Sequence, residues 1–464
     1  MNKNQFLVSF QEQVIVAQCT PQGAGAIALL RLSGNDVFNV VDKAARLASG
    51  KRLIDQNSHS IHFGSVINQR GQSIDQVLFL VMKGPRTFTG QDTVEITCHN
   101  NQFIVEEIMN TMIICGARIA GKGEFTQRAV TLGKLDLIQA EAIHDLIHAQ
   151  TAASLKYSLQ QLEGSLSSWV FEIENSVLEM IAFCEGSFEF LDEEMEFGAD
   201  ILKKMEQLLN KINKLLATFS KQQYIKEGIK IVLMGSVNVG KSSLFNCLLE
   251  KNRAIVTPVA GTTRDTIEAG VYKEGEFLTF IDTAGIRETE DEIERAGIDR
   301  SFQEASVADI ILLVVDRSQK ISIDIVAAYE KIMQNYSDKI ILVYNKMEEE
   351  ILFEEIKFDE RSIFVSAKNN QNIDLLYQEI FKKIKQLKGS DAITCLLNKR
   401  QYDLLFKFYR DLEEVLPMLT IRRIDYELVS YRLKESLSLM AELTGKTISQ
   451  AAFDKIFDTF CVGK

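Results

Sequence analysis

One short segment constrains the fold of this chain more than any other. Residues 235–242 satisfy the pattern G-x-x-x-x-G-K-[ST], follow an apolar run at 229–234 and continue into a helical pattern at 243–249. A strand, a glycine-rich loop and a helix in this order form a P-loop, whose backbone N–H groups surround phosphate oxygens. In such a loop Lys241 reaches the β- and γ-phosphates, and the Ser242 hydroxyl binds Mg²⁺. The segment therefore predicts a nucleotide-binding α/β domain.

Three further polar segments each follow an expected strand. Asp282-Thr-Ala-Gly285 follows an apolar run and offers a carboxylate for Mg²⁺ and a glycine N–H for the γ-phosphate. Asn345-Lys-Met-Glu348 stands where a guanine-reading N-K-x-D motif would lie, and Ser366-Ala-Lys368 ends the next strand. Because ligands bind at the carboxyl ends of strands in such sheets, these segments predict one site for GTP and Mg²⁺. ATP hydrolysis is the minor alternative.

Two positions depart from the usual GTPase motifs. Glu348 replaces the Asp that accepts two hydrogen bonds from guanine, and its extra methylene predicts weaker discrimination of the base. Ile286 stands where Ras-like enzymes carry a water-orienting Gln, and an apolar side chain cannot orient water. The acidic residues Asp291, Glu292 and Glu294 follow. They either take over this role or form a solvated charged surface.

The rest of the chain predicts two further kinds of domain, as its length of 464 residues suggests. Short β-type runs at 26–32, 77–81 and 94–97 alternate with turn clusters and indicate an α+β domain. Helical spacing runs from 135 to 219 and returns after 389, so the α/β domain is inserted into a discontinuous helical domain. The expected boundaries are 1–128 for the α+β domain, 129–224 and 389–464 for the helical domain, and 225–388 for the nucleotide domain.

Composition narrows the class of protein. The net charge of −12 disfavours non-specific binding to nucleic acid, so an RNA partner must meet a local basic patch. The seven cysteines are never spaced as C-x-x-C, which argues against a disulfide framework and a structural zinc site. No apolar run approaches the ~20 residues of a membrane-spanning helix, and residues 1–18 lack the apolar core of a secretory signal. We therefore expect a cytoplasmic protein.

Two smaller groups of residues have more than one interpretation. His144 and His148 lie one helical turn apart, but without the glutamate of H-E-x-x-H they favour a helix face over a zinc site. A set of basic residues in a helical segment near the C-terminus provides either a patch for tRNA or a solvated helix face. This set comprises Lys399, Arg400, Lys407 and Arg410, with Arg422 and Arg423 beyond.

Motifs spread over the whole chain carry a resemblance to a known family. They are Thr20-Pro21-x-Gly23, Arg31-Leu-Ser-Gly34, Phe88-Thr-Gly-x-Asp92, Gly123-Glu-Phe-Thr-x-Arg128, Gln139-Ala-Glu-Ala-Ile143, Gly261-Thr-Thr-Arg-Asp265, Asp282-Thr-Ala-Gly285 and the terminal Cys461-Val-Gly-Lys464. With the inserted position of the nucleotide domain, they make the chain resemble the MnmE (TrmE) family of tRNA modification GTPases.

The resemblance implies a fold and an activity. The fold is an N-terminal α+β domain that binds tetrahydrofolate and forms a homodimer, a discontinuous helical domain and an inserted Ras-like G domain. The activity adds an aminomethyl or carboxymethylaminomethyl group to C5 of the wobble uridine of certain tRNAs. It involves the flavoprotein MnmG, K⁺-activated GTP hydrolysis, and 5-formyl- or 5,10-methylene-tetrahydrofolate. The main alternative is an Era- or Der-like ribosome-assembly GTPase. A dynamin-like membrane GTPase is a third alternative, but the sequence lacks the amphipathic basic segment that would anchor such a protein to a membrane.

The resemblance also implies roles for individual residues. Glu294 would position the attacking water, and Cys461 would serve the modification chemistry. Folate would be bound by Arg31, Glu95, Lys134 and Lys464. K⁺ would be held by Asn238, Thr257, Val259 and Thr262, and Mg²⁺ by Ser242 and Thr263. The nucleotide would be contacted by Asn238, Val239, Gly240, Lys241, Ser242, Ser243, Thr257, Pro258, Val259, Ala260, Gly261, Thr262, Thr263, Asp282, Thr283, Ala284, Gly285, Asn345, Lys346, Glu348, Ser366, Ala367 and Lys368.

Overall fold

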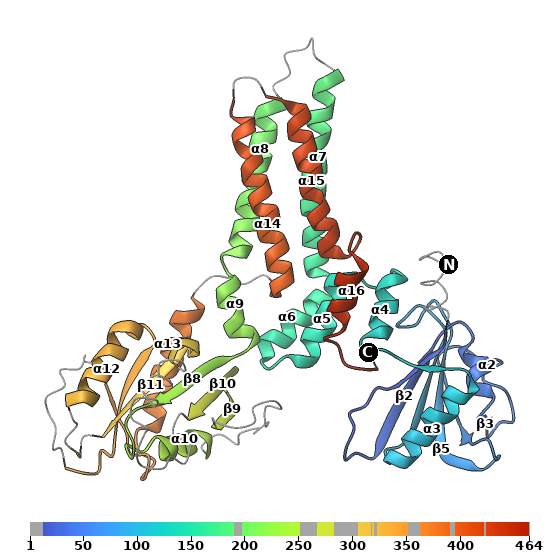
Figure 1. Cartoon of the computed structure of the whole chain (residues 1–464), viewed down its shortest axis with the longest axis horizontal. Helices are drawn as coiled ribbons and strands as arrows, with labels where there is room; N and C mark the ends of the chain where they lie inside the picture. Colours follow the sequence, from blue (N-terminus) through green and yellow to red (C-terminus); the bar gives the residue numbers. More distant parts are fainter. Residues whose placement is uncertain are drawn as a thin grey trace. The chain divides into compact units, whose positions relative to one another are not determined.

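The chain forms two compact units. Figure 1 shows their helices and strands, coloured along the sequence. The first comprises residues within 1–144, 161–208 and 407–464, and the second comprises residues within 145–160 and 209–406. The computed structural model describes residues 13–189, 197–250, 267–282, 305–316, 318–319, 323–350, 362–389, 395–421 and 424–463.

The first unit contains a seven-stranded sheet in the order β3-β4-β5-β6-β2-β1-β7. All neighbouring strands are antiparallel except β1 and β7, which are parallel. The strands are β1 (Ile15–Gln18), β2 (Ile27–Ser33), β3 (Ala45–Leu47), β4 (Ser60–Ile67), β5 (Ser73–Met82), β6 (Thr93–His99) and β7 (Arg118–Ile119). The three predicted β-type runs are confirmed as β2, β5 and β6.

Two helices cover one face of this sheet, α2 (Val37–Asp42) and α3 (Gln102–Cys115). Every second residue of β2 enters the core with them: Ala28, Leu30 and Leu32 are buried. This period of two is the pattern of a strand with one buried and one open face. The α+β prediction is therefore confirmed, and the residues between these positions, including Arg31, belong to the opposite face.

Helices from both ends of the chain pack together in the first unit. Helix α7 (Ser165–Glu189) precedes the nucleotide domain in the sequence, α15 (Tyr426–Thr444) follows it, and the two contact each other along their lengths. Lys434 forms an ion pair with Glu185, which joins them. The prediction that the two helical stretches pack as one is confirmed. The unit also contains α4 (Glu124–Thr131), η1 (Leu416–Leu419) and α16 (Gln450–Phe457), and shares α5 (Leu137–His148), α8 (Phe197–Leu216) and α14 (Lys399–Val415) with the second unit.

The second unit contains a six-stranded sheet in the order β13-β12-β11-β8-β10-β9. Its strands are β8 (Ile229–Met234), β9 (Ile267–Lys273), β10 (Glu276–Asp282), β11 (Ile310–Asp316), β12 (Ile340–Asn345) and β13 (Ile363–Phe364). The strands expected before the P-loop and before the three polar segments are confirmed as β8, β10, β12 and β13, and together with β11 they run parallel. One strand departs from this parallel arrangement, because β9 is an antiparallel edge strand joined to β10 by a hairpin.

Helices cover both faces of this second sheet. Alternate residues of β8 divide between two cores: Ile229, Ile231 and Leu233 pack with α10 (Lys241–Glu250) and α13 (Ile373–Lys388), and the residues between them pack with α12 (Ile323–Tyr336). Helices α6 (Ala152–Leu162) and α9 (Phe219–Lys226) complete the unit. Among the described residues, no helix combines the length and the hydropathy needed to cross a membrane.

Candidate nucleotide-binding site

The P-loop lies between β8 and α10, as predicted, and depends on glycine. Gly240 has a φ of +91°, and a Cβ there would collide with the Asn345 side chain. Gly235 has a φ of +152°, and a Cβ there would collide with the Val314 carbonyl oxygen. Only glycine allows both this backbone conformation and this approach. The loop therefore lies directly against the ends of β11 and β12.

Lys241 and Ser242 open helix α10. The Lys241 Nζ donates to the carbonyl oxygens of Gly235 and Ser236, at 2.8 Å each, and burial lowers the pKa of Lys241. The Ser242 hydroxyl donates to Asp282 Oδ2 at 2.7 Å. A hydroxyl and a carboxylate brought together beside a helix N-terminus are oxygen donors of the kind that Mg²⁺ prefers. These residues fit a phosphate-bound Mg²⁺.

Asn345 connects the P-loop to the segment Ser366–Lys368, which the sequence predicts to contact the base. Its side-chain Nδ2 donates to the Val239 carbonyl at 2.9 Å, and its Oδ1 accepts from the Ala367 N–H at 3.1 Å. Asn345 is buried, so these bonds are protected from water. One side chain thus joins the P-loop to the segment Ser366–Lys368. The sequence predicted the three segments separately, and the structure shows the bonds that join them.

The Glu348 carboxylate faces the same segment, Ser366–Lys368. A hydrogen bond from Ser366 lowers the pKa of Glu348, so the carboxylate is ionised in the neutral range. The longer side chain of Glu348 therefore still reaches Ser366, in the segment that the sequence predicts to lie beside the guanine base. Lys346, with a φ of +61°, forms an ion pair with Asp316 Oδ2 at 2.6 Å.

Two residues at this site were missed by the sequence analysis. Asp316 ends β11 and is buried, and hydrogen bonds from Lys346 and Ser318 outweigh its burial, so the pKa of Asp316 is lowered. It follows an apolar run as Asp282 does, so the same signal could have found it. The Tyr329 hydroxyl on α12 accepts from the Ser236 N–H at 2.6 Å. Nothing in the local sequence around Tyr329 indicates this contact.

Several predicted site residues lie outside the described residues. Asn238 is described: it is exposed on the P-loop and has a φ of +65°. The residues outside are Thr257, Pro258, Val259, Ala260, Gly261, Thr262, Thr263, Thr283, Ala284, Gly285, Ile286, Asp291, Glu292, Glu294, Arg422, Arg423 and Lys464.

A second group of predicted residues lies in the N-terminal α+β region. Arg31 and Glu95 are register partners on β2 and β6, and Arg31 Nε lies 2.8 Å from Glu95 Oε1. The Arg31 guanidinium also lies 5.7 Å from the ring centres of Phe88 and Phe125. The Lys134 ammonium donates to the Pro85 carbonyl at 3.0 Å, in the loop that carries Phe88. The structure pairs Arg31 with Glu95 and places Lys134 against the neighbouring loop.

The C-terminal tail lies on the same α+β region. Lys122 and Val462 form an antiparallel bridge, and the Gly123 N–H donates to the Cys461 carbonyl at 3.3 Å. The tail then reaches the end of β1, where Cys19 Sγ donates to the Gly463 carbonyl at 3.1 Å. Cys461 itself is exposed. The tail thus folds back onto the α+β region through contacts at Lys122, Gly123 and Cys19.

The described members of the two smaller groups of predicted residues lie on helices. Within the part of the chain that the structure describes, no three His, Cys, Asp or Glu side chains are grouped to hold a metal, and the ring of His144 packs against Phe460. On α14, Lys399 pairs with Asp403 and Arg410 with Glu413. These pairs within the helix offset the basic charge that tRNA would need.

The regions on both sides of the nucleotide domain decide the family. Residues 14–134 match the family model described as "GTP-binding protein TrmE N-terminus", and residues 137–461 match "MnmE helical domain". The chain belongs to the MnmE family. The MnmE proteins named tRNA modification GTPase from Aquifex aeolicus and Geobacillus kaustophilus are 37% and 38% identical to it, each over 97% of this chain and 99% of the relative.

Membership of the MnmE family makes the chain a GTPase with a TrmE-type N-terminal domain, a helical domain and a Ras-like G domain. Its nucleotide and metal are GTP and Mg²⁺. The Era- or Der-like alternative is not favoured, because the flanking regions match MnmE and TrmE domains. Among solved structures, the G domain of the T. maritima FeoB iron transporter is 23% identical, covering 35% of this chain and 99% of its own, with a TM-score of only 0.25.

Proposed function

We propose that this MnmE-family GTPase acts on tRNA in the cytoplasm. With the flavoprotein MnmG it adds an aminomethyl or carboxymethylaminomethyl group to C5 of the wobble uridine of certain tRNAs. The carbon would come from 5-formyl- or 5,10-methylene-tetrahydrofolate. The domains that carry out these steps are bounded near residues 128, 224 and 388.

One observation carries the proposal: the tail with Cys461 ends beside the strand that holds Arg31. Gly463 contacts the end of β1 at Gln18 and Cys19, and Gln18 is the register partner of Leu30 on β2. The next residue of β2 is Arg31, which is paired with Glu95. The tail residue Gly463, two residues after the exposed Cys461, thus contacts the strand next to the one that carries Arg31.

The residue types around Arg31 support a folate site. A carboxylate such as Glu95 accepts hydrogen bonds from the amino edge of a pterin, and Arg31, Lys134 and Lys464 are cations for its glutamate tail. Glu95→Gln keeps the size of the side chain and removes its charge. We expect this variant to weaken binding of 5-formyl-tetrahydrofolate at least tenfold by calorimetry, whereas Glu106→Gln, on the exposed side of α3, should bind normally. Equal affinity of both variants would contradict the assignment.

Cys461 is proposed to serve the modification and not GTP hydrolysis. In a reaction supplied with MnmG, a folate donor, GTP and tRNA, Cys461→Ser should abolish wobble-uridine modification, measured by mass spectrometry of digested tRNA. GTP hydrolysis should stay within about twofold of the unmodified chain, which is roughly 0.4 kcal/mol in activation free energy. Full modification by the variant would reduce Cys461 to a structural residue of the tail.

K⁺ is proposed to neutralise the charge that develops on the phosphates during hydrolysis. The exposed amide of Asn238 lies on the P-loop, and Thr257, Val259 and Thr262 would supply the other oxygens; Thr263 would join Ser242 on Mg²⁺. Hydrolysis should fall sharply when K⁺ is replaced by Na⁺. Asn238→Ala should lose this K⁺ dependence, and Val237→Ala, which removes an exposed apolar side chain from the same loop, should keep it. Equal rates in both salts would exclude the K⁺ site.

Glu294 is proposed to position the attacking water, because Ile286 cannot. Glu294→Ala should leave GTP binding unchanged and slow hydrolysis by a factor on the order of 10² or more. The neighbouring variants Asp291→Ala and Glu292→Ala serve as controls and should hydrolyse GTP at nearly the normal rate. If one of them is the damaging change instead, the role belongs to that residue.

A homodimer is proposed to form through the N-terminal α+β domain. Ile61, Phe63 and Leu78 lie on the sheet face opposite α2 and α3, and their side chains are 65%, 53% and 41% exposed. They are adjacent in register, so they form one apolar surface beside the Arg31–Glu95 pair. A contiguous exposed apolar surface of this kind is typical of protein–protein contacts. A second copy of this chain is the proposed occupant.

A further inference from the structure

The tail residues Cys461, Val462 and Gly463 are held on the N-terminal α+β region by contacts of two kinds. Backbone atoms supply the first kind: the bridge between Lys122 and Val462, and the bond from the Gly123 N–H to the Cys461 carbonyl. A side chain supplies the second: the Cys19 thiol donates to the Gly463 carbonyl at 3.1 Å. Cys19 and Gly463 are separated by 444 residues in the sequence.

Gly463 lets the tail approach more closely than any other residue could. Its φ is +93°, a backbone region that side chains disfavour. A Cβ at this position would lie 2.6 Å from the Gln18 carbonyl oxygen and 3.1 Å from the Cys19 Cα. Because both neighbours are backbone atoms of β1 and the residue after it, they cannot move aside without disturbing the sheet. The tail backbone therefore occupies one defined place at the end of β1.

Cys19 is itself held in place by the strand that carries Arg31. Its backbone N–H donates to the Leu29 carbonyl at 2.7 Å, which extends the β1–β2 pairing by one residue. Its side chain is partly buried. The thiol is thus oriented from a rigid sheet toward the Gly463 carbonyl. A continuous set of bonds leads from the β2 strand through Cys19 to Gly463, two residues from Cys461.

We propose that Cys19 is a positioning residue that holds the C-terminal tail on β1 and so places Cys461 for the modification reaction. The proposal rests on the proposed role of Cys461, but it concerns a different residue and a different measurement. A thiol is a weak hydrogen-bond donor, and one hydrogen bond changes an opening equilibrium by roughly two- to tenfold. Loss of the Cys19 thiol should therefore loosen the tail without unfolding the domain.

Hydrogen–deuterium exchange of the full chain tests the contact directly. Cys19→Ala should raise exchange roughly two- to tenfold, both in the C-terminal peptide and at the peptide that contains Gly123. Cys19→Ser retains a hydroxyl donor and should restore most of the protection. Cys115→Ala removes another partly exposed thiol, on α3, and should exchange as the unmodified chain does. Unchanged exchange in Cys19→Ala would overturn the proposal.

Gly463→Ala perturbs the same contact from the other side. The added methyl group cannot fit against Gln18, so this variant should also raise exchange at Gly123, and by more than Cys19→Ala does. In the reconstituted reaction, both variants should lower tRNA modification while GTP hydrolysis stays normal, and Cys19→Ser should modify tRNA nearly as well as the unmodified chain. Equal loss of modification in the Ala and Ser variants of Cys19 would show that the hydrogen bond is not responsible.

The two proposals fail in different ways. If Cys461→Ser modifies tRNA fully, the function of Cys461 is wrong, but the exchange data still decide whether Cys19 holds the tail. If Cys461→Ser is inactive while Cys19→Ala shows normal exchange and normal modification, the role of Cys461 stands and the positioning role of Cys19 is overturned.

Discussion

Glu124 is a buried carboxylate placed between two arginines. Its Oε1 lies 2.6 Å from Arg118 Nη2 and 3.0 Å from Arg128 Nη2, and its Oε2 accepts from the Gly121 N–H at 2.9 Å. Burial acts to raise the pKa of Glu124, but these bonds and charges outweigh it, so the pKa is lowered. Arg128 is only 3% exposed and depends on this carboxylate for its counter-charge.

We predict that Glu124→Gln costs about 3 kcal/mol of unfolding free energy near neutral pH, because it leaves the buried Arg128 charge without a carboxylate. The pKa of Glu124 is lower in the folded than in the unfolded chain. Its stabilising contribution is therefore present above the ordinary carboxyl pKa and is lost as the pH falls through the lowered folded value. Urea unfolding should show a large difference in unfolding free energy between Glu124→Gln and the unmodified chain at neutral pH, and a smaller difference in acid. The exposed Glu163→Gln should show neither effect, and a difference independent of pH would contradict the assignment.

Gly240 and Gly275 separate two effects of a glycine replacement in the G domain. Both have positive φ, +91° and +85°, but a Cβ at Gly240 would meet Asn345, whereas at Gly275 it would meet nothing within 4 Å. We predict that Gly240→Ala weakens GDP binding more than tenfold, because it separates the P-loop from Asn345 and the segment Ser366–Lys368. Gly275→Ala should cost only the backbone strain of roughly 1–2 kcal/mol and bind GDP normally. Titration with a fluorescent GDP measures both, and equal affinities would contradict the prediction.

At the scale of elements, local hydrogen bonds define where several helices begin. The Asp425 side chain accepts from the Leu428 N–H at 3.0 Å and caps α15, the helix that packs on α7. Ser449 caps α16 in the same way. An N-cap oxygen satisfies a backbone donor that has no partner within the helix.

We predict that Asp425→Ala destabilises the first unit by about 1 kcal/mol, the usual value of an N-cap. Asp425→Asn keeps the accepting oxygen and should lie within a few tenths of a kcal/mol of the unmodified chain. Thermal unfolding followed by circular dichroism at 222 nm, where helices absorb, distinguishes the two variants. An equal loss of stability in both variants would mean that the charge of Asp425, and not its N-cap hydrogen bond, stabilises the helix.

The hairpin of β9 and β10 shows why one element escaped the sequence analysis. Residues 267–273 carry Gly270 in their middle and three exposed or charged side chains, Glu268, Tyr272 and Lys273, so they lack the continuous apolar pattern of the other strands of this sheet. In the structure the Phe277 ring of the partner strand lies against Gly270, in the space that a side chain would fill. Glu274 and Gly275, both with positive φ, make the tight turn. Pairing with β10, and not its own composition, makes this segment a strand.

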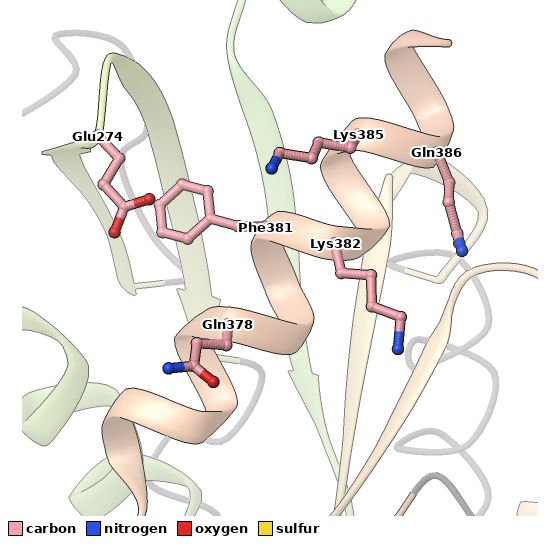
Figure 2. A pocket seen from close by; sticks show the side chains of 6 residues that line it. All are labelled: Glu274, Gln378, Phe381, Lys382, Lys385 and Gln386. Atoms are coloured by element: carbon pink, nitrogen blue, oxygen red, sulfur yellow. The ribbon is translucent and has the colours of Figure 1, made fainter. Parts of the chain in front are cut away.

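An open cavity lies between the turn of this hairpin and α13. It has a volume of about 500 Å³ and is lined by Glu274, Gln378, Phe381, Lys382, Lys385 and Gln386 (Figure 2). Lys382 is paired with Glu379, and Lys388 at the end of α13 with Glu276. Opposite charges therefore offset one another around the cavity, which lies on α13 and the hairpin, apart from the P-loop residues.

At the scale of the whole molecule, the proposed dimer depends on one face of the N-terminal sheet. We predict that Ile61→Glu converts a dimer into a monomer, because it places a charge in the apolar surface formed with Phe63 and Leu78. Ile114→Glu is the matched control: Ile114 lies on α3 and is 61% exposed, close to the 65% of Ile61, but it is not on this face. Light scattering coupled to gel filtration measures the mass of each variant. A monomeric parent chain, or dimers in both variants, would contradict the prediction.

The sequence by itself determined the elements whose signals are local. The P-loop needs only a strand, two glycines, a lysine and a helix in order, and Asp282 and Asn345 each follow an apolar strand directly. The alternation of buried residues in β2 and β8 is likewise a property of consecutive residues. For these parts, nearest neighbours in the sequence are also the residues that impose the conformation, so the pattern predicts the structure.

Only the tertiary structure decided the contacts between distant segments. Asn345 bonds to Val239, Tyr329 to Ser236, and Cys19 to Gly463 across 444 residues. No period or spacing encodes such pairs, because each partner is brought to the other by the packing of whole sheets and helices. The buried Arg128 and its partners Ser33 and Gln91, which lie 95 and 37 residues away in the sequence, have the same cause. Their conformations and charges are stabilised by neighbours in space, and the free energy that selects them exists only once those neighbours are assembled.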